Sequence, residues 1–251
     1  MAASMTGKCS LVADIGSDHA YLPVSLILSG NALRAIVTDL RQGPLENSRR
    51  TAQKYGLVEK MSFSRGSGFG ALDGYARPDV ITVCGMGGEL IKSFIGERPD
   101  IARGSVLVLQ PMNNAGMLEK YLRQQGYSVT DQAISTDGIH YYRCMRAVYT
   151  GEREDDPDAC DCEFPPCLLE KRDPVMYSYL QKRLDTAERI LCSMERGAAA
   201  DTSVVGETRK LVNILKERIG RYDSYGDSGR NKHVCGRTQR PGVGQQRPAD
   251  R

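Results

Sequence analysis

The sequence lacks any apolar run close to the roughly 20 residues that a membrane-spanning helix requires. Residues 1–10 also lack the basic segment and following apolar segment of a secretory signal. The eight cysteines are scattered, and two of them fall in predicted buried strands. Reduced thiols are the rule in the cytosol, so we expect a cytoplasmic protein without a membrane partner.

A zinc signature is missing as well. Cys160, Cys162 and Cys167 follow the spacing C-x-C-x4-C, which matches no common zinc pattern. We therefore expect a polar connector there and no metal.

The net charge is +3, but residues 221–251 hold seven basic and three acidic residues, so the other 220 residues carry −1. Such a body is not generally basic, and any contact with RNA must use a local patch.

Residues 11–149 alternate short apolar runs with helical patterns, which is the signature of βαβ units. Because the last two strands read as a hairpin, we predict a doubly wound α/β domain over residues 1–150 with an antiparallel strand at one edge. The expected strands are 11–13, 35–37, 61–63, 79–84, 105–109, 127–134 and 139–149, and the expected helices are 20–28, 43–56, about 89 onward, and 115–125.

The rest of the chain has a different pattern. Residues 151–170 are an acidic connector with proline and cysteine, and residues 171–220 carry apolar positions at helical spacing. This pattern predicts a helical hairpin with an apolar seam at Tyr177, Leu180, Leu184, Ala187, Leu191 and Met194. Residues 221–251 have few apolar side chains, so we predict a disordered tail.

The dinucleotide fingerprint G-x-G-x-x-G is absent, although a predicted strand, turn and helix stand where it would lie. The segment reads ADIGSDHAYLP and places carboxylates at Asp14 and Asp18 around Gly16 and Ser17. These carboxylates would repel a pyrophosphate. They suit a ligand that carries an ammonium and a sulfonium and no phosphate, which describes S-adenosylmethionine. An ordinary βα turn is the alternative interpretation.

Three other predicted parallel strands end at the same edge of the sheet as this turn. Asp39 ends the second strand, where an acid can accept hydrogen bonds from both ribose hydroxyls. Gly66 and Ser67 follow the third strand, where methyltransferases that use S-adenosylmethionine often contact the adenine ring of that cofactor. An exposed strand-end acid and a flexible loop are the alternatives for these two positions.

The fourth strand ends at Gly85, Met86 and Gly87, where glycines allow a ligand to approach the backbone closely. A purely structural turn is the alternative. This loop lacks the Asn/Asp-Pro-Pro-aromatic sequence that is common in nucleic-acid amino methyltransferases, which argues against an exocyclic amine as the acceptor.

The segments ADIGSDHAYLP, D-V-I-T-x-x-G-M-G-G and LVLQP resemble those of the bacterial tRNA (adenine-N1) methyltransferases that act on position 22. The resemblance covers about residues 2–220. It implies a Rossmann-like class I methyltransferase sheet followed by a two-helix, coiled-coil-like extension. It also implies S-adenosylmethionine as the cofactor and tRNA as the substrate.

Methyl transfer to N1 requires the acceptor nitrogen about 3 Å from the methyl carbon, so the base must be unpaired or extruded. The new positive charge on the ring can be stabilised by a carboxylate, which can also take the N6 proton. We assign that role to Asp18, with His19 assisting and Tyr21 stacking on the base or hydrogen-bonding it. A locally satisfied helix-start residue and a core aromatic are the alternatives for His19 and Tyr21.

Gln110 is placed to hydrogen-bond the adenine edge, unless it is a plain strand-end residue. Lys182 and Arg183 lie off the apolar seam and can meet tRNA phosphates, unless they form only a solvated face. The sequence leaves two functional alternatives open. The first is a methyltransferase with a protein or small-molecule acceptor, and the second is a protein that binds S-adenosylmethionine without turnover. A nicotinamide-binding protein is disfavoured by the missing fingerprint. The sequence predicts no particular oligomeric state.

Overall fold

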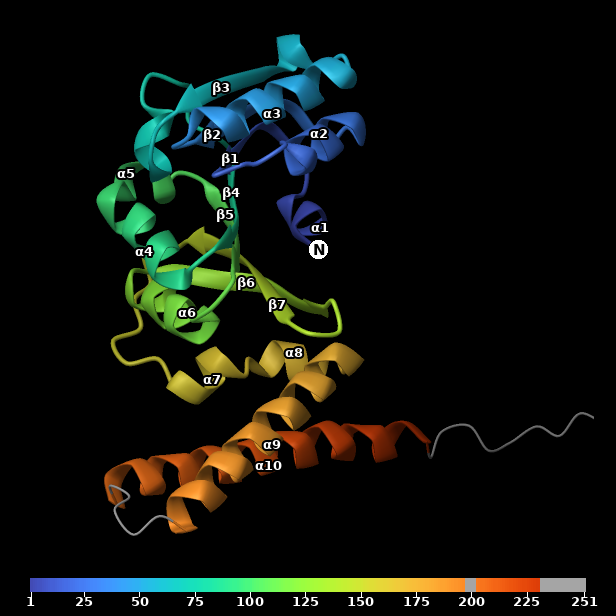
Figure 1. Cartoon of the computed structure of the whole chain (residues 1–251), viewed down its shortest axis with the longest axis vertical. Coiled ribbons are helices and arrows are strands. Elements are labelled where there is room, and N and C mark those ends of the chain that lie inside the picture. The colour runs from blue at the N-terminus through green and yellow to red at the C-terminus, as the bar shows by residue number, and fades with distance from the viewer. Residues whose placement is uncertain (197–201, 231–251) are drawn as a thin grey trace, which may run out of the picture.

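The computed structural model describes residues 1–196 and 202–230, and within them the main body is a seven-stranded sheet with the order β3-β2-β1-β4-β5-β7-β6 (Figure 1). Strands β1 to β5 pair in parallel, and β7 runs antiparallel to both β5 and β6. The predicted edge hairpin is confirmed, with its antiparallel strand one position inside the edge. The strands are Cys9–Ile15, Ala32–Asp39, Met61–Arg65, Val80–Met86, Val106–Pro111, Tyr127–Thr136 and Tyr141–Tyr149 for β1 to β7.

Helices cover both faces of the sheet, and the strands alternate their side chains between the two layers. Ile81 and Leu107 point to the layer of α4 and α6, whereas Val80 and Val108 point to the layer of α1 to α3. Burial on both faces explains why the sequence shows continuous apolar runs. The helices are α1 Ala2–Thr6, α2 Tyr21–Leu28, α3 Gln42–Lys54, α4 Gly88–Glu97, α5 Pro99–Ala102 and α6 Ala115–Gln124, with 3-10 turns at Val58–Lys60 and Gly68–Leu72.

The segment predicted as a connector, 151–170, contains two short helices, α7 Ala159–Glu163 and α8 Pro166–Glu170. Phe164, Leu168 and Leu169 from this segment are buried in the third apolar cluster of the protein. The connector is thus a packed layer between the sheet and the C-terminal helices (Figure 1). Its helices were not predicted because each is too short for a periodic apolar pattern.

Helices α9 Pro174–Arg196 and α10 Thr202–Arg230 form the predicted helical extension. The predicted seam positions from Tyr177 to Leu191 lie in the third cluster, where Leu180 and Ala187 face Leu215 and Ile219 of α10. The helix α10 continues ten residues beyond the predicted end at 220, and residues 231–251 of the predicted tail lie outside the described residues.

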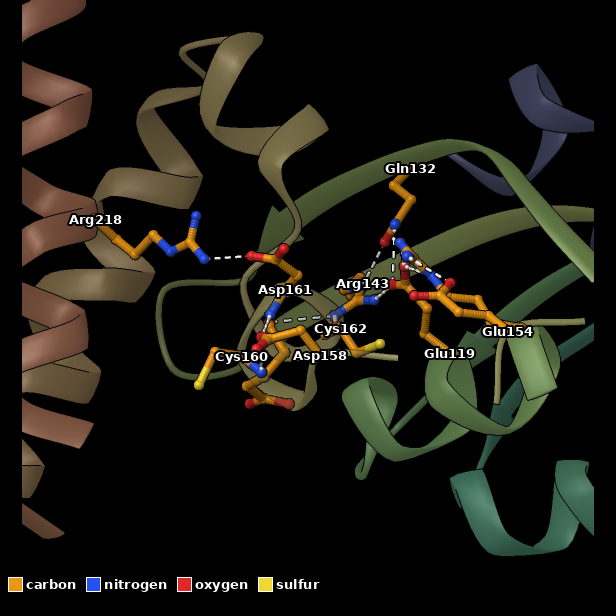
Figure 2. A network of polar contacts seen from close by, with 11 residues as sticks. Glu119, Gln132, Arg143, Glu154, Asp158, Cys160, Asp161, Cys162 and Arg218 are labelled. Carbon is orange, nitrogen blue, oxygen red and sulfur yellow. Dashed lines mark hydrogen bonds and ion pairs between the residues drawn. The ribbon is translucent and has the colours of Figure 1, made fainter. Parts of the chain in front are cut away.

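A buried polar network attaches this extension to the sheet. Glu119 on α6 is fully buried and accepts hydrogen bonds from Arg143 on β7 and from Gln132 on β6. Figure 2 shows the three side chains converging. Arg143 also donates to the carbonyl oxygens of Cys162 and Glu163, at 2.7 and 3.2 Å, which fixes α7 to the sheet.

A second ion pair continues the connection to the last helix. Arg218 of α10 pairs with Asp161 of α7 (Figure 2). The sheet, α7 and α10 are therefore linked in series through polar contacts.

No helix in the described ranges is long and apolar enough to cross a membrane. The seven cysteines in those ranges are free thiols. No cluster of His, Cys, Asp or Glu within the same residues has the arrangement of a metal site, and Cys160, Cys162 and Cys167 lie on α7 and α8.

Candidate cofactor and acceptor site

The first carboxylate of the site is Asp14, near the carboxyl end of β1. Its side chain is only 6% exposed, and the hydroxyl of Thr82 on neighbouring β4 donates to its Oδ1 at 2.5 Å. Burial raises the pKa of the Asp14 carboxyl, and hydrogen bonds from Ser17 and Thr82 act in the opposite direction. Asp14 is thus held rigidly beneath the turn that follows β1.

That turn runs from Gly16 to Ala20 and is bent sharply. Gly16 has a φ of 68°, a backbone conformation that other residues rarely adopt, so glycine suits this turn, and the flexible methyl end of Met86 lies directly beside it. His19 and Ala20 also have positive φ values, of 72° and 53°. Strain of this kind, at about 1–3 kcal/mol per residue, is concentrated at functional sites.

The second carboxylate, Asp39, ends β2 beside this turn. The turn is tied to β2 because the N–H of Ser17 donates to the carbonyl oxygen of Thr38 at 2.9 Å. Asp39 is 8% exposed, and its Oδ1 accepts the N–H of Arg41 at 2.7 Å. No donor from the described residues lies at hydrogen-bond distance of Oδ2, which leaves that oxygen available for a ligand.

The loop after β3 joins the same edge. The N–H of Gly66 donates to the carbonyl oxygen of Asp39 at 3.1 Å. Ser67 follows in extended conformation and precedes the 3-10 turn at Gly68–Leu72. Leu40 directly follows Asp39 in the chain, and no sequence motif marks it. Its side chain is 62% exposed. These positions provide backbone polar groups and one exposed apolar side chain.

The glycine loop after β4 is held from β5. Gly85 has a φ of 75°, and its N–H donates to Oε1 of Gln110 at 2.9 Å. The Gln110 amide nitrogen donates to the carbonyl oxygen of Pro111 at 3.2 Å. The Gln110 amide is therefore engaged at both ends within the protein. A Cβ placed on Gly85 would have open space around it, so this loop has room for a ligand.

The loop after β5 packs directly on the glycine loop. The Oδ1 atom of Asn113 accepts the N–H of Gly88 at 3.2 Å, and Met112 N–H donates to the carbonyl oxygen of Met86 at 2.8 Å. A Cβ on Gly88 would lie 2.8 Å from the carbonyl oxygen of Asn113, so only glycine permits this approach without a backbone shift.

The side chains predicted to act on the acceptor base stand together at the start of α2. Asp18 is 55% exposed, and it accepts a hydrogen bond from the amide of Asn47 at 3.2 Å. His19 Nε2 lies 3.7 Å from the Asp18 carboxylate, and the imidazole stacks on Tyr21 with 5.3 Å between ring centroids. Tyr21 is 64% exposed, which excludes the alternative of a core aromatic. The group offers a carboxylate and an open aromatic surface.

Lys182 and Arg183 lie elsewhere, on α9. Lys182 Nζ donates to the carbonyl oxygen of Ile139 at the tip of the β6–β7 hairpin, at 2.7 Å. Arg183 donates to Glu163 at 2.8 Å and to the Tyr179 hydroxyl at 3.0 Å. Within the described residues, neither side chain contacts the strand-end residues, so the structure does not bring them into the same site.

Three supporting residues were missed at the sequence level. Asn113 follows closely after LVLQP, so its position after a strand is a signal that could have found it. Thr82 lies inside the D-V-I-T segment as a polar residue within an apolar strand, which is the signal that could have found it. Asn47 stands in the middle of α3 and reaches Asp18 only through the fold. No local pattern marks such a residue.

Comparison with known proteins now defines the family. Residues 12–217 match the family TrmK, described as tRNA (adenine(22)-N(1))-methyltransferase. The chain belongs to this family. The tRNA (adenine(22)-N(1))-methyltransferase of Bacillus subtilis (strain 168) is 33% identical over 217 residues, which are 84% of this chain and 90% of the relative.

Solved structures agree with the TrmK assignment. The B. subtilis m1A22 tRNA methyltransferase TrmK superposes with a TM-score of 0.77 at 27% identity, covering 87% of this chain and 95% of that one. Streptococcus pneumoniae Sp1610 in complex with S-adenosyl-L-methionine gives a TM-score of 0.76 at 26% identity, covering 87% and 96%. The Rossmann-like methyltransferase fold expected from the sequence is therefore confirmed.

Proposed function

We propose that this chain transfers a methyl group from S-adenosylmethionine to N1 of adenine 22 in tRNA. The observation that carries the cofactor assignment is the pair of nearly buried carboxylates, Asp14 and Asp39, that end the adjacent strands β1 and β2. Two carboxylates repel a phosphate and attract a cation. S-adenosylmethionine supplies an electrophilic methyl group on a sulfonium and carries no phosphate.

The cofactor-binding residues follow from their places along this edge. Asp14, Gly16 and Ser17 hold the amino acid portion at the β1 turn, and the Oδ2 atom of Asp39 accepts from the ribose hydroxyls. Gly66 and Ser67 contact the adenine ring beside it. Gly85, Met86 and Gly87 bound the space next to the reacting methyl group, where the Gly85 backbone leaves room.

The residues proposed to bind the acceptor base lie at the same edge of the sheet, at the start of α2. Tyr21 stacks on the target adenine together with His19, because the two rings are already nearly parallel, at 9°. Asp18 stabilises the positive charge that develops on the ring and takes the N6 proton. Gln110 acts on the acceptor side through the Gly85 loop that it supports.

The tRNA body is held by the C-terminal helices. Lys182 and Arg209 contact phosphates, Arg209 by exchanging its exposed ion pair with Glu195. Exposed pairs of this kind contribute at most about 1 kcal/mol, so a phosphate can replace the carboxylate with little loss.

The proposed reaction is tested with labelled S-adenosylmethionine and two unmodified tRNAs, one of them with adenine 22 replaced by guanine. We expect label on the first tRNA only, located at N1 of adenine 22. Label on both tRNAs would reject the position, and label on neither would reject tRNA as the acceptor.

Asp39→Asn should weaken S-adenosylmethionine binding about 10–100-fold. The asparagine can still accept the Arg41 N–H, but it loses the charge and one acceptor oxygen, and hydrogen bonds to charged groups contribute about 1.5–3 kcal/mol. Isothermal titration calorimetry measures the change in Kd. Asp185→Asn on α9, an exposed aspartate away from the sheet, is the matched control. Equal affinities of the two variants would remove Asp39 from the cofactor site.

A further inference from the structure

A cavity of about 280 Å³ lies between the methyltransferase sheet and the C-terminal helices. The loop after β5 forms one wall, the β6–β7 hairpin forms another, and α8 and α9 close the far side. Small-molecule pockets measure about 300–1,000 Å³, so this cavity, just below that range, suits a single flat ring system. None of the residues assigned to the cofactor lines it.

The cavity has an exposed rim and a buried floor. Met112, Asn113 and Asn114 are exposed, and they belong to the loop that contacts the glycine loop through Gly88. Leu168 and Met176, from α8 and α9, are each 1% exposed at the floor. The rim therefore stands beside the edge where methyl transfer takes place, and the floor lies toward the helical extension.

Aromatic and polar groups share the walls. Tyr141 and Tyr179 line the cavity with their ring centroids 5.2 Å apart. Asn113 uses its Oδ1 atom for Gly88, and no acceptor among the described residues lies at hydrogen-bond distance of its amide nitrogen. Aromatic surface combined with an available amide donor matches a nucleobase, which has a π-face and carbonyl or ring-nitrogen acceptors.

The charges in the cavity are already balanced. Glu163 neutralises Arg183, and Glu119 neutralises Arg143 behind the wall. An isolated phosphate or carboxylate would meet no net positive charge and would lie close to the Glu163 carboxylate. A neutral ring with polar edges avoids this penalty.

We propose that this cavity receives a second nucleobase of the bound tRNA, distinct from the target adenine. The proposal rests on the proposed function. N1 lies on the Watson–Crick edge, so methylating it requires the target base to leave its pair and stack. When the target adenine is extruded, the base that was paired with it loses its pairing partner, and the bases next to it lose a stacking partner. Holding that base in the cavity offsets the cost of opening the RNA and keeps the target base exposed.

Tyr141→Leu should raise the KM for tRNA about 5- to 150-fold, because base–aromatic contacts contribute about 1–3 kcal/mol per base. The Kd for S-adenosylmethionine should stay unchanged. Tyr141→Phe keeps the ring and should restore the KM to within about twofold of the unmodified protein. Tyr142→Leu is the matched control, since this adjacent strand residue does not line the cavity and its hydroxyl donates to Asp137.

A merely structural role for Tyr141 would lower thermal stability and cofactor affinity together. That result, or an unchanged KM in Tyr141→Leu, would overturn the subsite.

A second measurement does not depend on removing Tyr141. A photoreactive amino acid in place of Met112, on the exposed rim, should crosslink to one tRNA nucleotide other than adenine 22. The same amino acid in place of Leu33 should give no crosslink, because Leu33 is exposed near the start of β2, at the opposite end of that strand from Asp39. Crosslinking to adenine 22 alone, or no crosslink at position 112, would contradict a second-base site.

The crosslinked nucleotide then supplies a coupled test. A tRNA that is abasic at this nucleotide should show the raised KM with the unmodified protein and no further rise with Tyr141→Leu, because both changes remove one contact. Independent, additive effects would overturn the proposal. Failure of the proposed function is separately visible, since the unmodified protein would then transfer no methyl group to intact tRNA.

Discussion

Arg143→Met is expected to lower the free energy of unfolding by about 3–5 kcal/mol, the usual effect of removing one partner of a buried ion pair. Glu119 is fully buried, and its Oε2 atom accepts from both Arg143 and Gln132. Without the guanidinium, Glu119 keeps two partners among the described residues, the partly exposed Arg123, at 2.6 Å, and Gln132. The carbonyl oxygens of Cys162 and Glu163 also lose their donor, so the attachment of α7 weakens in the same variant.

Chemical denaturation measured by circular dichroism gives the change. Arg146→Met, on the same strand, is the control, because Arg146 bonds at the surface to Thr130, and its loss should change the free energy of unfolding by less than about 1 kcal/mol. Adding Glu119→Leu to Arg143→Met should recover part of the stability, since the unpaired charge is then gone. Equal stability of the Arg143 and Arg146 variants would show that the buried pair does not hold the extension.

Asp18→Asn should lower kcat for tRNA methylation about 100- to 10,000-fold, the range typical for loss of a group that transfers a proton in the transition state. Asparagine keeps the shape of the side chain and can still accept the Asn47 amide hydrogen. It loses the negative charge that would stabilise the methylated ring. Since Asp18 is exposed and lies outside the buried core, folding should be unaffected.

Single-turnover methylation with saturating cofactor separates the chemical step from binding, and calorimetry measures the Kd for S-adenosylmethionine in parallel. A near-normal rate would remove the assigned role of Asp18. A loss of cofactor affinity equal to the loss of rate would place Asp18 among the cofactor-binding residues. Asp185→Asn, on the exposed face of α9, should match the unmodified protein in both measurements.

Local sequence features predicted much of the sheet and its edge. All seven predicted strands are present, and Asp14, Asp39 and Gly85 lie at strand ends on one edge because carboxyl ends of parallel strands meet there. Elements of about five residues, such as α1 and α7, were not predicted because they show less than two turns of periodicity. Their stability comes from burial against the rest of the protein.

Single residues show where local inference stops. The sequence assigns Gln110 to the substrate, and in the structure its amide holds the glycine loop, 25 positions away in the sequence. The sequence assigns Arg183 to tRNA phosphate, and in the structure Arg183 pairs with Glu163 in the segment predicted as a connector. In both cases the residue type was informative about hydrogen bonding or charge, and the partner depended on which loops the fold brings together.

The sequence by itself determined the positions of the strands, the sequence motif that marks the TrmK family, and the acidic, glycine-rich strand ends suited to a cationic cofactor. These properties are encoded over a few neighbouring residues, through apolar periodicity and backbone freedom. Only the tertiary structure decided that β7 inserts between β5 and β6, and that the extension is anchored through Glu119 and Arg143. The two side chains are 24 positions apart, and their pairing arises only when α6 packs across the hairpin, because burial and charge compensation depend on distance in space.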